Sequence, residues 1–300
     1  MITDELELTS TKVILRAACD VYPNAGELPV IECITPKCRA VIALQGAQIL
    51  SFCPSDGHEL LWLSPLETFE YGKAIRGGIP LCLPWFGVNR REPALAKHGF
   101  ARNQSWSLDN VTETAGGDLA LRFLFQSSAE DLQVFPWAFS ARLDVLLSDT
   151  LALNLSVLNS SDKAMPLSFA MHSYFAVSGL SALALDGVDG AEYLDNCQNL
   201  TQCRQEETLR FSGEIDRVYE GLSGTQTLRD GARAISVKGT ACDTVVVWNP
   251  GAVLADTIAD VGAHFAEYVC VERGMAFADE FLLAPGQRHE ASMTLAATST

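Results

Sequence analysis

Two ionisable side chains interrupt otherwise apolar stretches of the sequence. Glu272 ends the run Tyr268–Glu272, whose other members are Tyr, Val, Cys and Val, and a carboxylate there costs free energy unless it is paired or reaches solvent. His172 lies in the run Ser168–Phe175, where strand alternation gives it small and polar neighbours on one face. A carboxylate and an imidazole can act together as general base and general acid. The simpler alternatives are a strand-terminal glutamate that reaches solvent and a histidine whose hydrogen bonds are satisfied in the core.

The segment from Lys73 to Arg102 has a charge opposite to that of the whole chain. It contains six basic residues and one acidic residue, so it carries +5, whereas the other 270 residues carry −21. Glycines and prolines interrupt the segment throughout, which predicts irregular loops. Arginine can hold a phosphate with two parallel hydrogen bonds, so these loops suit a small anion. The alternative is a solvated loop whose charges pair with the acidic surface. The basic residues are Lys73, Arg76, Arg90, Arg91, Lys97 and Arg102.

Other common catalytic motifs are absent from the sequence. Neither Gly-x-Ser-x-Gly nor a Walker A pattern occurs, so nothing indicates a serine hydrolase of that type or a P-loop enzyme. The histidines never lie two or four positions apart, and the nine cysteines never form Cys-x-x-Cys. We therefore expect no metal site and no disulfide framework. Most of the cysteines are expected to be reduced and packed in the core.

The elements that must position these residues are short β-strands. In Phe139–Leu147 and Leu151–Val157 apolar side chains alternate with polar ones, and three turn-forming residues separate the runs, which predicts a β-hairpin with one buried face. Similar runs recur between Gly, Pro, Asn and Asp residues, and only Ala129–Val134 and Leu254–Phe265 are candidates for short helices. Because neither has a β-α-β context, we expect an all-β fold, a large antiparallel β-sandwich, in a single domain over residues 1–300.

The composition limits the partners and the location. With 37 acidic and 21 basic side chains, the 300-residue chain carries −16, a charge that repels phosphate backbones and anionic lipid surfaces. We therefore expect no nucleic-acid partner and no membrane partner. The first residues lack the basic and apolar pattern of a secretory signal, and no apolar run reaches the roughly 18 residues that a membrane helix needs. These features predict a cytoplasmic protein.

Several short motifs occur in a characteristic order. The main ones are Ala74–Pro80 continued by Pro84–Gly87, Lys97–Arg102, Met171–Phe175 and Val269–Glu272, with Asp216–Tyr219 and Trp248–Gly251 in addition. In order and approximate spacing they resemble the glucose-6-phosphate 1-epimerase, or hexose-6-phosphate mutarotase, branch of the aldose 1-epimerase family. The resemblance covers most of the chain beyond about residue 40. It implies a large antiparallel β-sandwich, in agreement with the strand pattern.

The resemblance also implies roles for individual residues. His172 would be the general acid and Glu272 the general base. The substrate site would be lined by Arg76, Lys97, Arg102 and Asp216, with His98 close by.

These residue types suit the interconversion of the α and β anomers of a hexose 6-phosphate. The reaction removes the proton of the C1 hydroxyl and protonates the ring oxygen, so one base and one acid are enough. Because each positioned proton transfer contributes about 10²–10⁴-fold, the reaction requires no metal and no other cofactor. The expected partner is a small-molecule sugar phosphate, glucose 6-phosphate first, and the chain is expected to be a monomer.

Three alternatives stay open on the sequence. The first is an aldose 1-epimerase that acts on unphosphorylated sugars, in which case the basic segment is only surface. The second is a carbohydrate-binding or regulatory protein without turnover, although such a protein would not need both His172 and Glu272. The third is a sugar lyase or hydrolase, for which the sequence shows no distinct pair of carboxylates.

Overall fold

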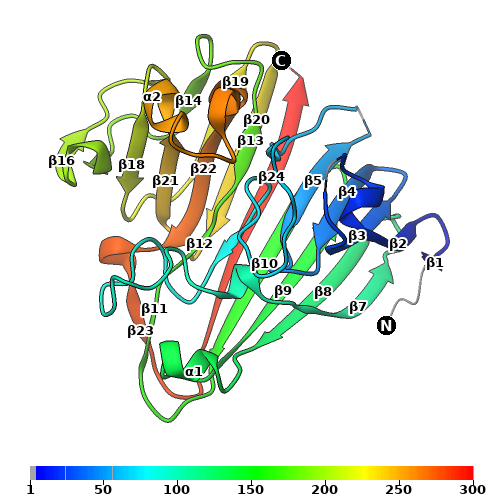
Figure 1. Ribbon diagram of the computed structural model, residues 1–300. Helices are drawn as coiled ribbons and strands as arrows, with labels where there is room; N and C mark the ends of the chain where they lie inside the picture. Colours follow the sequence, from blue (N-terminus) through cyan, green and yellow to red (C-terminus); the bar gives the residue numbers. More distant parts are fainter. Residues whose placement is uncertain (1–4, 24, 56, 300) are drawn as a thin grey trace.

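The computed structural model describes residues 5–23, 25–55, 57–299 and shows a protein built almost entirely of β-strands (Figure 1). Every named strand pair within this part of the chain is antiparallel, and the strands form sheets of nine, eight, five and two members. The all-β class and the antiparallel arrangement predicted from the sequence are therefore confirmed. The single domain predicted over residues 1–300 includes residues 1–4, 24, 56 and 300, which lie outside the description, and it stays a prediction.

The nine-stranded sheet contains the predicted hairpin. Residues at alternate positions of β9 and β10 are buried, and Leu147 lies opposite Leu151, so the short turn fixes which face is apolar. In spatial order the strands are β17 (Leu209–Arg210), β14 (Ala184–Asp186), β19 (Thr225–Asp230), β20 (Arg233–Thr240), β24 (Arg288–Ser299), β10 (Leu151–Asn159), β9 (Phe139–Leu147), β8 (Leu119–Gln126) and β7 (Ser107–Glu113).

The eight-stranded sheet packs against the nine-stranded one and carries the residues of chemical interest. Side-chain contacts join the two sheets, for example the hydrogen bond from Arg273 of one to Gln226 of the other. The strands, in spatial order, are β16 (Thr201–Arg204), β15 (Glu192–Asp195), β18 (Ile215–Tyr219), β21 (Thr244–Asn249), β22 (Tyr268–Met275), β12 (Phe169–Met171) and β6 (Leu81–Cys82), and β13 (Tyr174–Ala176) also pairs with β22.

The two smaller sheets complete the strand structure. One hydrophobic core joins buried side chains of the five-stranded sheet with those of the two large sheets. The five-stranded sheet consists of β1 (Glu5–Glu7), β2 (Lys12–Ala17), β3 (Pro29–Ile34), β4 (Cys38–Ala43) and β5 (Ile49–Pro54), and the two-stranded sheet of β11 (Met165–Leu167) and β23 (Phe281–Leu283).

Helices are few and short, as expected, but one prediction needs correction. The helix α1 (Asp131–Val134) lies within the expected segment. The segment Leu254–Phe265 is not one helix, because α2 ends at Ala255 and a 3-10 helix begins only at Gly262. The two α-helices are α1 and α2 (Gly251–Ala255), and the 3-10 helices are η1 (Ala18–Asp20), η2 (Ala101–Asn103), η3 (Asn196–Gln198), η4 (Gly262–Glu267) and η5 (Phe277–Asp279).

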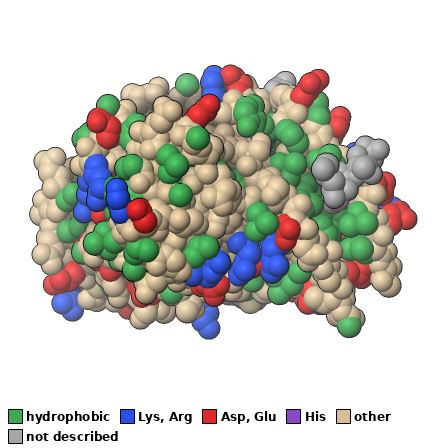
Figure 2. Space-filling model, turned by 90° about the horizontal axis from the view of Figure 1, so that it is seen from below, with side chains coloured by type: hydrophobic (Ala, Val, Ile, Leu, Met, Phe, Trp, Pro, Cys, Tyr) green, Lys and Arg blue, Asp and Glu red, His purple; other side chains and the backbone are tan. Residues whose placement is uncertain are grey.

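Cysteines and surface charge follow the composition. Five of the nine cysteines are buried, namely Cys33, Cys38, Cys82, Cys242 and Cys270, which confirms that most of them pack in the core. On the face shown in Figure 2, basic side chains form small groups separated by acidic, apolar and uncharged atoms. Within the described part of the chain, no helix has the length and apolar character needed to cross a membrane.

Candidate active site

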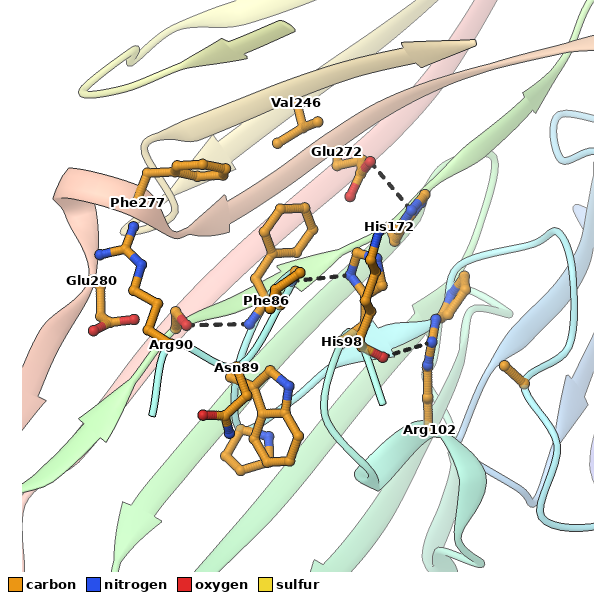
Figure 3. Close-up of a pocket in the computed structure, with 18 of the residues that line it drawn as sticks. Phe86, Asn89, Arg90, His98, Arg102, His172, Val246, Glu272, Phe277 and Glu280 are labelled. Atoms are coloured by element: carbon orange, nitrogen blue, oxygen red, sulfur yellow. Dashed lines mark hydrogen bonds and ion pairs between the residues drawn. The ribbon is translucent and has the colours of Figure 1, made fainter. Parts of the chain in front are cut away.

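A cavity of about 1020 Å³ opens beside the eight-stranded sheet (Figure 3). Its walls come from β18 and β22, from the β12–β13 junction, and from the irregular segment between Lys73 and Arg102. That segment contains only β6 and η2 as regular elements, so the predicted loops are confirmed. The cavity is lined by all seven residues expected from the sequence, which are Arg76, Lys97, His98, Arg102, His172, Asp216 and Glu272.

His172 and Glu272 face each other at the bottom of the cavity. The Nε2 atom of His172 lies 3.3 Å from Oε1 of Glu272, and the residues are only 7% and 1% exposed. Strand β22 continues past Glu272 to Met275, so the simpler interpretation of a strand-terminal glutamate that reaches solvent is wrong. The interpretation of His172 as a histidine with satisfied hydrogen bonds does not hold either. Among the described residues, no group forms a hydrogen bond with Nδ1 of His172 or with Oε2 of Glu272.

The environment shifts the pKa values of the pair in opposite directions. Burial raises the pKa of Glu272 well above its ordinary value, and the negative charge of Asp216 adds to this, while Arg102 opposes it. Burial lowers the pKa of His172 well below its ordinary value, and His98, Arg102 and Arg76 lower it further. Each group therefore favours its neutral form, in which the pair carries one transferable proton.

Tyr174 forms a rigid wall against the imidazole. The two rings are stacked, with centroids 4.8 Å apart and planes 7° apart. The Tyr174 hydroxyl accepts a hydrogen bond of 3.1 Å from Nη1 of Arg76, whose Nε donates to Oδ2 of Asp260 at 3.0 Å. The edge of Trp248 meets both rings. The imidazole is thus held in a fixed plane by contacts that do not use its nitrogens.

His98 lines the cavity beside His172. Its ring meets that of His172 edge to face at 5.5 Å, and its Nδ1 accepts a hydrogen bond of 3.3 Å from the backbone of Gly87. Burial and nearby cations lower the pKa of His98 to about 3, so it stays neutral at physiological pH. The backbone of His98 has a φ of 69°, an unusual conformation for a residue other than glycine. Such strain is often retained at functional sites.

Arg102 and Lys97 line the cavity and have no carboxylate partner among the described residues. Arg102 donates from Nη2 to the backbone oxygen of Lys97 at 3.0 Å, and its buried Nε has no hydrogen-bond partner within the described ranges. Among those residues neither Arg102 nor Lys97 forms an ion pair, whereas Arg76 is paired with Asp260. Arg102 and Lys97 therefore provide unneutralised positive charge to a molecule in the cavity.

Asp216 provides a carboxylate on the β18 side of the cavity. Its Oδ2 accepts a hydrogen bond of 2.6 Å from Asn196. Burial raises the pKa of Asp216, with Glu214 adding to the effect, and Lys97 opposes it. Since carboxylates commonly accept hydrogen bonds from sugar hydroxyls, Asp216 is suited to orient a substrate. No cluster of three His, Cys, Asp or Glu residues able to hold a metal ion occurs in the described part of the chain.

Comparison with known proteins places this site in a family. Residues 29–296 match the family model described as Aldose 1-epimerase. The chain belongs to the aldose 1-epimerase family. It is an epimerase by that membership, and the resemblance seen in the sequence is confirmed.

Relatives of this epimerase point the same way. A protein from Cenchrus ciliaris named "Putative glucose-6-phosphate 1-epimerase" is 34% identical over 273 residues, which are 87% of this chain and 82% of the relative. A protein of the same name from Escherichia coli strain K12 is 33% identical over 254 residues, 83% of this chain and 84% of the relative. A crystal structure described as a "putative mutarotase" from Salmonella typhimurium superposes on this chain with a TM-score of 0.86 at 27% identity. The superposition covers 99% of this chain and 96% of that one.

Some residues that shape the epimerase site were not found from the sequence. Tyr174 shares the sequence motif and the strand face of His172, and that was a usable signal. Asp260 gave none, because it lies in a turn 184 residues from Arg76 along the chain. Arg90 and Arg91 were noted only as part of the basic segment, yet both line the cavity.

Proposed function

We propose that this epimerase interconverts the anomers of a hexose 6-phosphate, glucose 6-phosphate first, with Glu272 as general base and His172 as general acid. The observation that carries the proposal is the buried pair of Glu272 and His172, 3.3 Å apart, in a cavity that Arg102 and Lys97 also line without a carboxylate partner among the described residues. The names of the relatives in Cenchrus ciliaris and Escherichia coli support the phosphorylated substrate.

Ring opening needs one proton removed and one supplied. Glu272 accepts the proton of the C1 hydroxyl as the C1–O5 bond breaks and the C1 carbonyl forms, and His172 donates a proton to O5. After rotation about C1–C2, His172 takes the proton back from the O5 hydroxyl as O5 attacks C1, and Glu272 returns its proton to the former carbonyl oxygen. Protons and electrons balance over the cycle, and both residues end as they began.

The shared proton of the pair matches this scheme. Opening requires the proton on His172 and a free carboxylate on Glu272, whereas burial alone favours two neutral groups. At 3.3 Å the proton can pass from one to the other without changing the net charge of the pair. The free Oε2 of Glu272 then remains as an acceptor for the C1 hydroxyl.

The phosphate is assigned to Arg102 and Lys97. Their charges are not neutralised by a carboxylate within the described residues, and hydrogen bonds to charged groups contribute about 1.5–3 kcal/mol. Arg76 lies at the same cavity but shares its charge with Asp260 and anchors Tyr174. Asp216 and His98 complete the wall around the hexose ring.

Exchange between the anomers, measured by NMR magnetisation transfer on glucose 6-phosphate and on glucose, tests this proposal. His172→Ala is expected to abolish the enzymatic exchange, whereas His289→Ala, which changes a histidine outside the cavity lining, is expected to keep it. Arg102→Ala is expected to lower kcat/KM about 10- to 100-fold for glucose 6-phosphate and little for glucose. Equal efficiency of the unchanged protein on both sugars would refute the phosphate preference, and exchange that survives His172→Ala would refute the catalytic assignment.

A further inference from the structure

The cavity extends well beyond the catalytic pair. Its volume of about 1020 Å³ lies at the upper end of the roughly 300–1,000 Å³ of pockets that hold drug-sized ligands, and a single hexose phosphate is smaller than such ligands. Figure 3 shows that Phe86, Arg90 and Phe277 lie on the side of the cavity away from Arg102. We call this part the outer lobe, and its residues are Phe86, Asn89, Arg90, Arg91, Trp137 and Phe277. The carboxylate of Glu280 also lines it and lies beside Arg90 (Figure 3).

The outer lobe presents two arginines that rest on aromatic rings. The guanidinium carbon of Arg90 lies 5.8 Å from the ring centre of Phe277, and that of Arg91 lies 4.6 Å from the ring centre of Trp137. Neither arginine forms an ion pair with a carboxylate among the described residues, although the chain outside the basic segment carries −21. A guanidinium held on an aromatic ring keeps its N–H donors available for an anion.

The backbone holds these side chains in place. Asn89 is 8% exposed, and its Oδ1 accepts hydrogen bonds from the backbone nitrogens of Arg91 and Glu92 at 2.9 and 3.1 Å. The resulting turn directs the two consecutive arginines to different rings. Phe277 has a φ of 57°, and in addition the buried Nε1 of Trp137 has no hydrogen-bond partner in the described part of the chain. The lobe therefore combines fixed cations, apolar rings and an unused donor.

We propose that the outer lobe binds a second sugar ring that carries a phosphate, so that reducing disaccharide phosphates are substrates as well. The inference rests on the proposed function. The reducing hexose must leave its C1 hydroxyl free at Glu272 and His172, so an additional ring has to be attached at another carbon. The aromatic rings suit the apolar faces of that sugar, and the arginines suit its phosphate, which they can bind through two parallel hydrogen bonds.

Anomer exchange of maltose 6′-phosphate, in which the non-reducing ring carries the phosphate, tests the proposal beside glucose 6-phosphate. The double variant Arg90→Ala/Arg91→Ala is expected to lower kcat/KM for maltose 6′-phosphate about 10- to 100-fold and to change that for glucose 6-phosphate less than about twofold. Arg204→Ala removes an exposed arginine outside the cavity lining and serves as the matched control. A single Phe277→Ala variant is expected to act in the same direction with a smaller effect.

Each other outcome contradicts a defined part of the proposal. Exchange of glucose 6-phosphate without exchange of maltose 6′-phosphate would overturn the outer lobe as a sugar site and leave the proposed function standing. An equal loss for both substrates in the double variant would show that Arg90 and Arg91 hold the phosphate of the single hexose. Absence of exchange with both substrates in the unchanged protein would overturn the proposed function and this inference together.

Discussion

The two faces of strand β22 carry buried charges of opposite kind in consecutive residues. Glu272 points into the cavity and Arg273 points between the two large sheets, and they are 1% and 0% exposed. Arg273 donates from Nη1 to Oε1 of Gln226 at 2.8 Å and to the backbone oxygen of Leu222 at 3.2 Å. Its Nη2 lies 4.0 Å from Asp243, and its Nε and Nη2 have no hydrogen-bond partner among the described residues. Glu272 has only His172, and one of its oxygens has no partner among the described residues.

This difference separates a structural charge from a reactive one. Around Arg273, fixed acceptors from neighbouring strands replace part of the water that the guanidinium loses, so the charge stabilises the packing of the sheets. Glu272 instead lines the cavity, and its Oε2 has no donor among the described residues. A substrate hydroxyl can supply the missing hydrogen bond, and the free energy not spent in the resting site becomes available for binding and proton transfer.

The largest expected effect comes from changing Glu272, on the face of β22 that lines the cavity, which we call the reactive face. Glu272→Gln keeps the size of the side chain but cannot accept a proton, so we expect the exchange rate of glucose 6-phosphate to fall about 10²–10⁴-fold. NMR magnetisation transfer at saturating substrate measures this rate. Glu280→Gln, at a carboxylate that also lines the cavity, is the matched control. A loss below tenfold in Glu272→Gln would show that another group acts as the base.

The next largest effect comes from the opposite face of β22, which holds Arg273 and which we call the structural face. Gln226→Leu removes the side-chain acceptor of the buried Arg273 guanidinium, and we expect the free energy of unfolding to fall by about 1.5–3 kcal/mol. Urea unfolding followed by fluorescence measures this change. Gln202→Leu changes an exposed glutamine on β16 and is expected to have little effect. Because Gln226 does not line the cavity, we expect kcat for anomer exchange to stay within about twofold. A large loss of kcat would contradict the division of β22 into a structural and a reactive face.

The sequence predicted more of the reactive face than of the structural one. The alternation in Phe139–Leu147 and its neighbour predicted the hairpin, and the family resemblance implied that His172 and Glu272 act together. A strand that ends at Glu272 was one alternative on the sequence, and the structure contradicts it. Burial of Arg273 depends on Gln226, 47 residues away in sequence, and local patterns contain no information on such pairing. For the same reason the contact of Asp260 with Arg76 could not be foreseen.

The burial of Glu272 is also expected to make the stability of the protein depend on pH. The folded pKa of Glu272 is raised above the ordinary value of 4.5, so the folded state binds more protons than the unfolded state above that pH. The free energy of unfolding therefore falls as pH rises above 4.5, by about 1.4 kcal/mol for each unit of pKa shift. Glu272→Gln removes this cost, so we expect the variant to be more stable than the unchanged protein at pH 7 and equally stable below pH 4.

Urea unfolding at a series of pH values measures the difference between the two proteins. A Glu272→Gln variant that is less stable than the unchanged protein at pH 7 would contradict the raised pKa. It would also mean that the contact with His172 contributes more than the burial of the carboxylate costs. Glu272 would then be stabilised by its partner, as Arg273 is on the other face of β22.

The smallest expected effect comes from changing Tyr174, whose ring stacks on His172. Tyr174→Phe keeps the ring that stacks on His172 but loses the hydroxyl bound by Arg76. We expect kcat to fall by no more than about tenfold, which is less than the 10- to 100-fold expected for a charged hydrogen bond made directly to the substrate, with the pH dependence of kcat nearly unchanged. Tyr174→Leu removes the ring as well, so the imidazole can turn away from the substrate. The loss of kcat is then expected to be larger, and the pH profile is expected to shift. If both variants lost the same activity, the Tyr174 hydroxyl and Arg76 would be what positions His172. The catalytic pair would then depend on a hydrogen-bonded arginine, as the packing around Arg273 does.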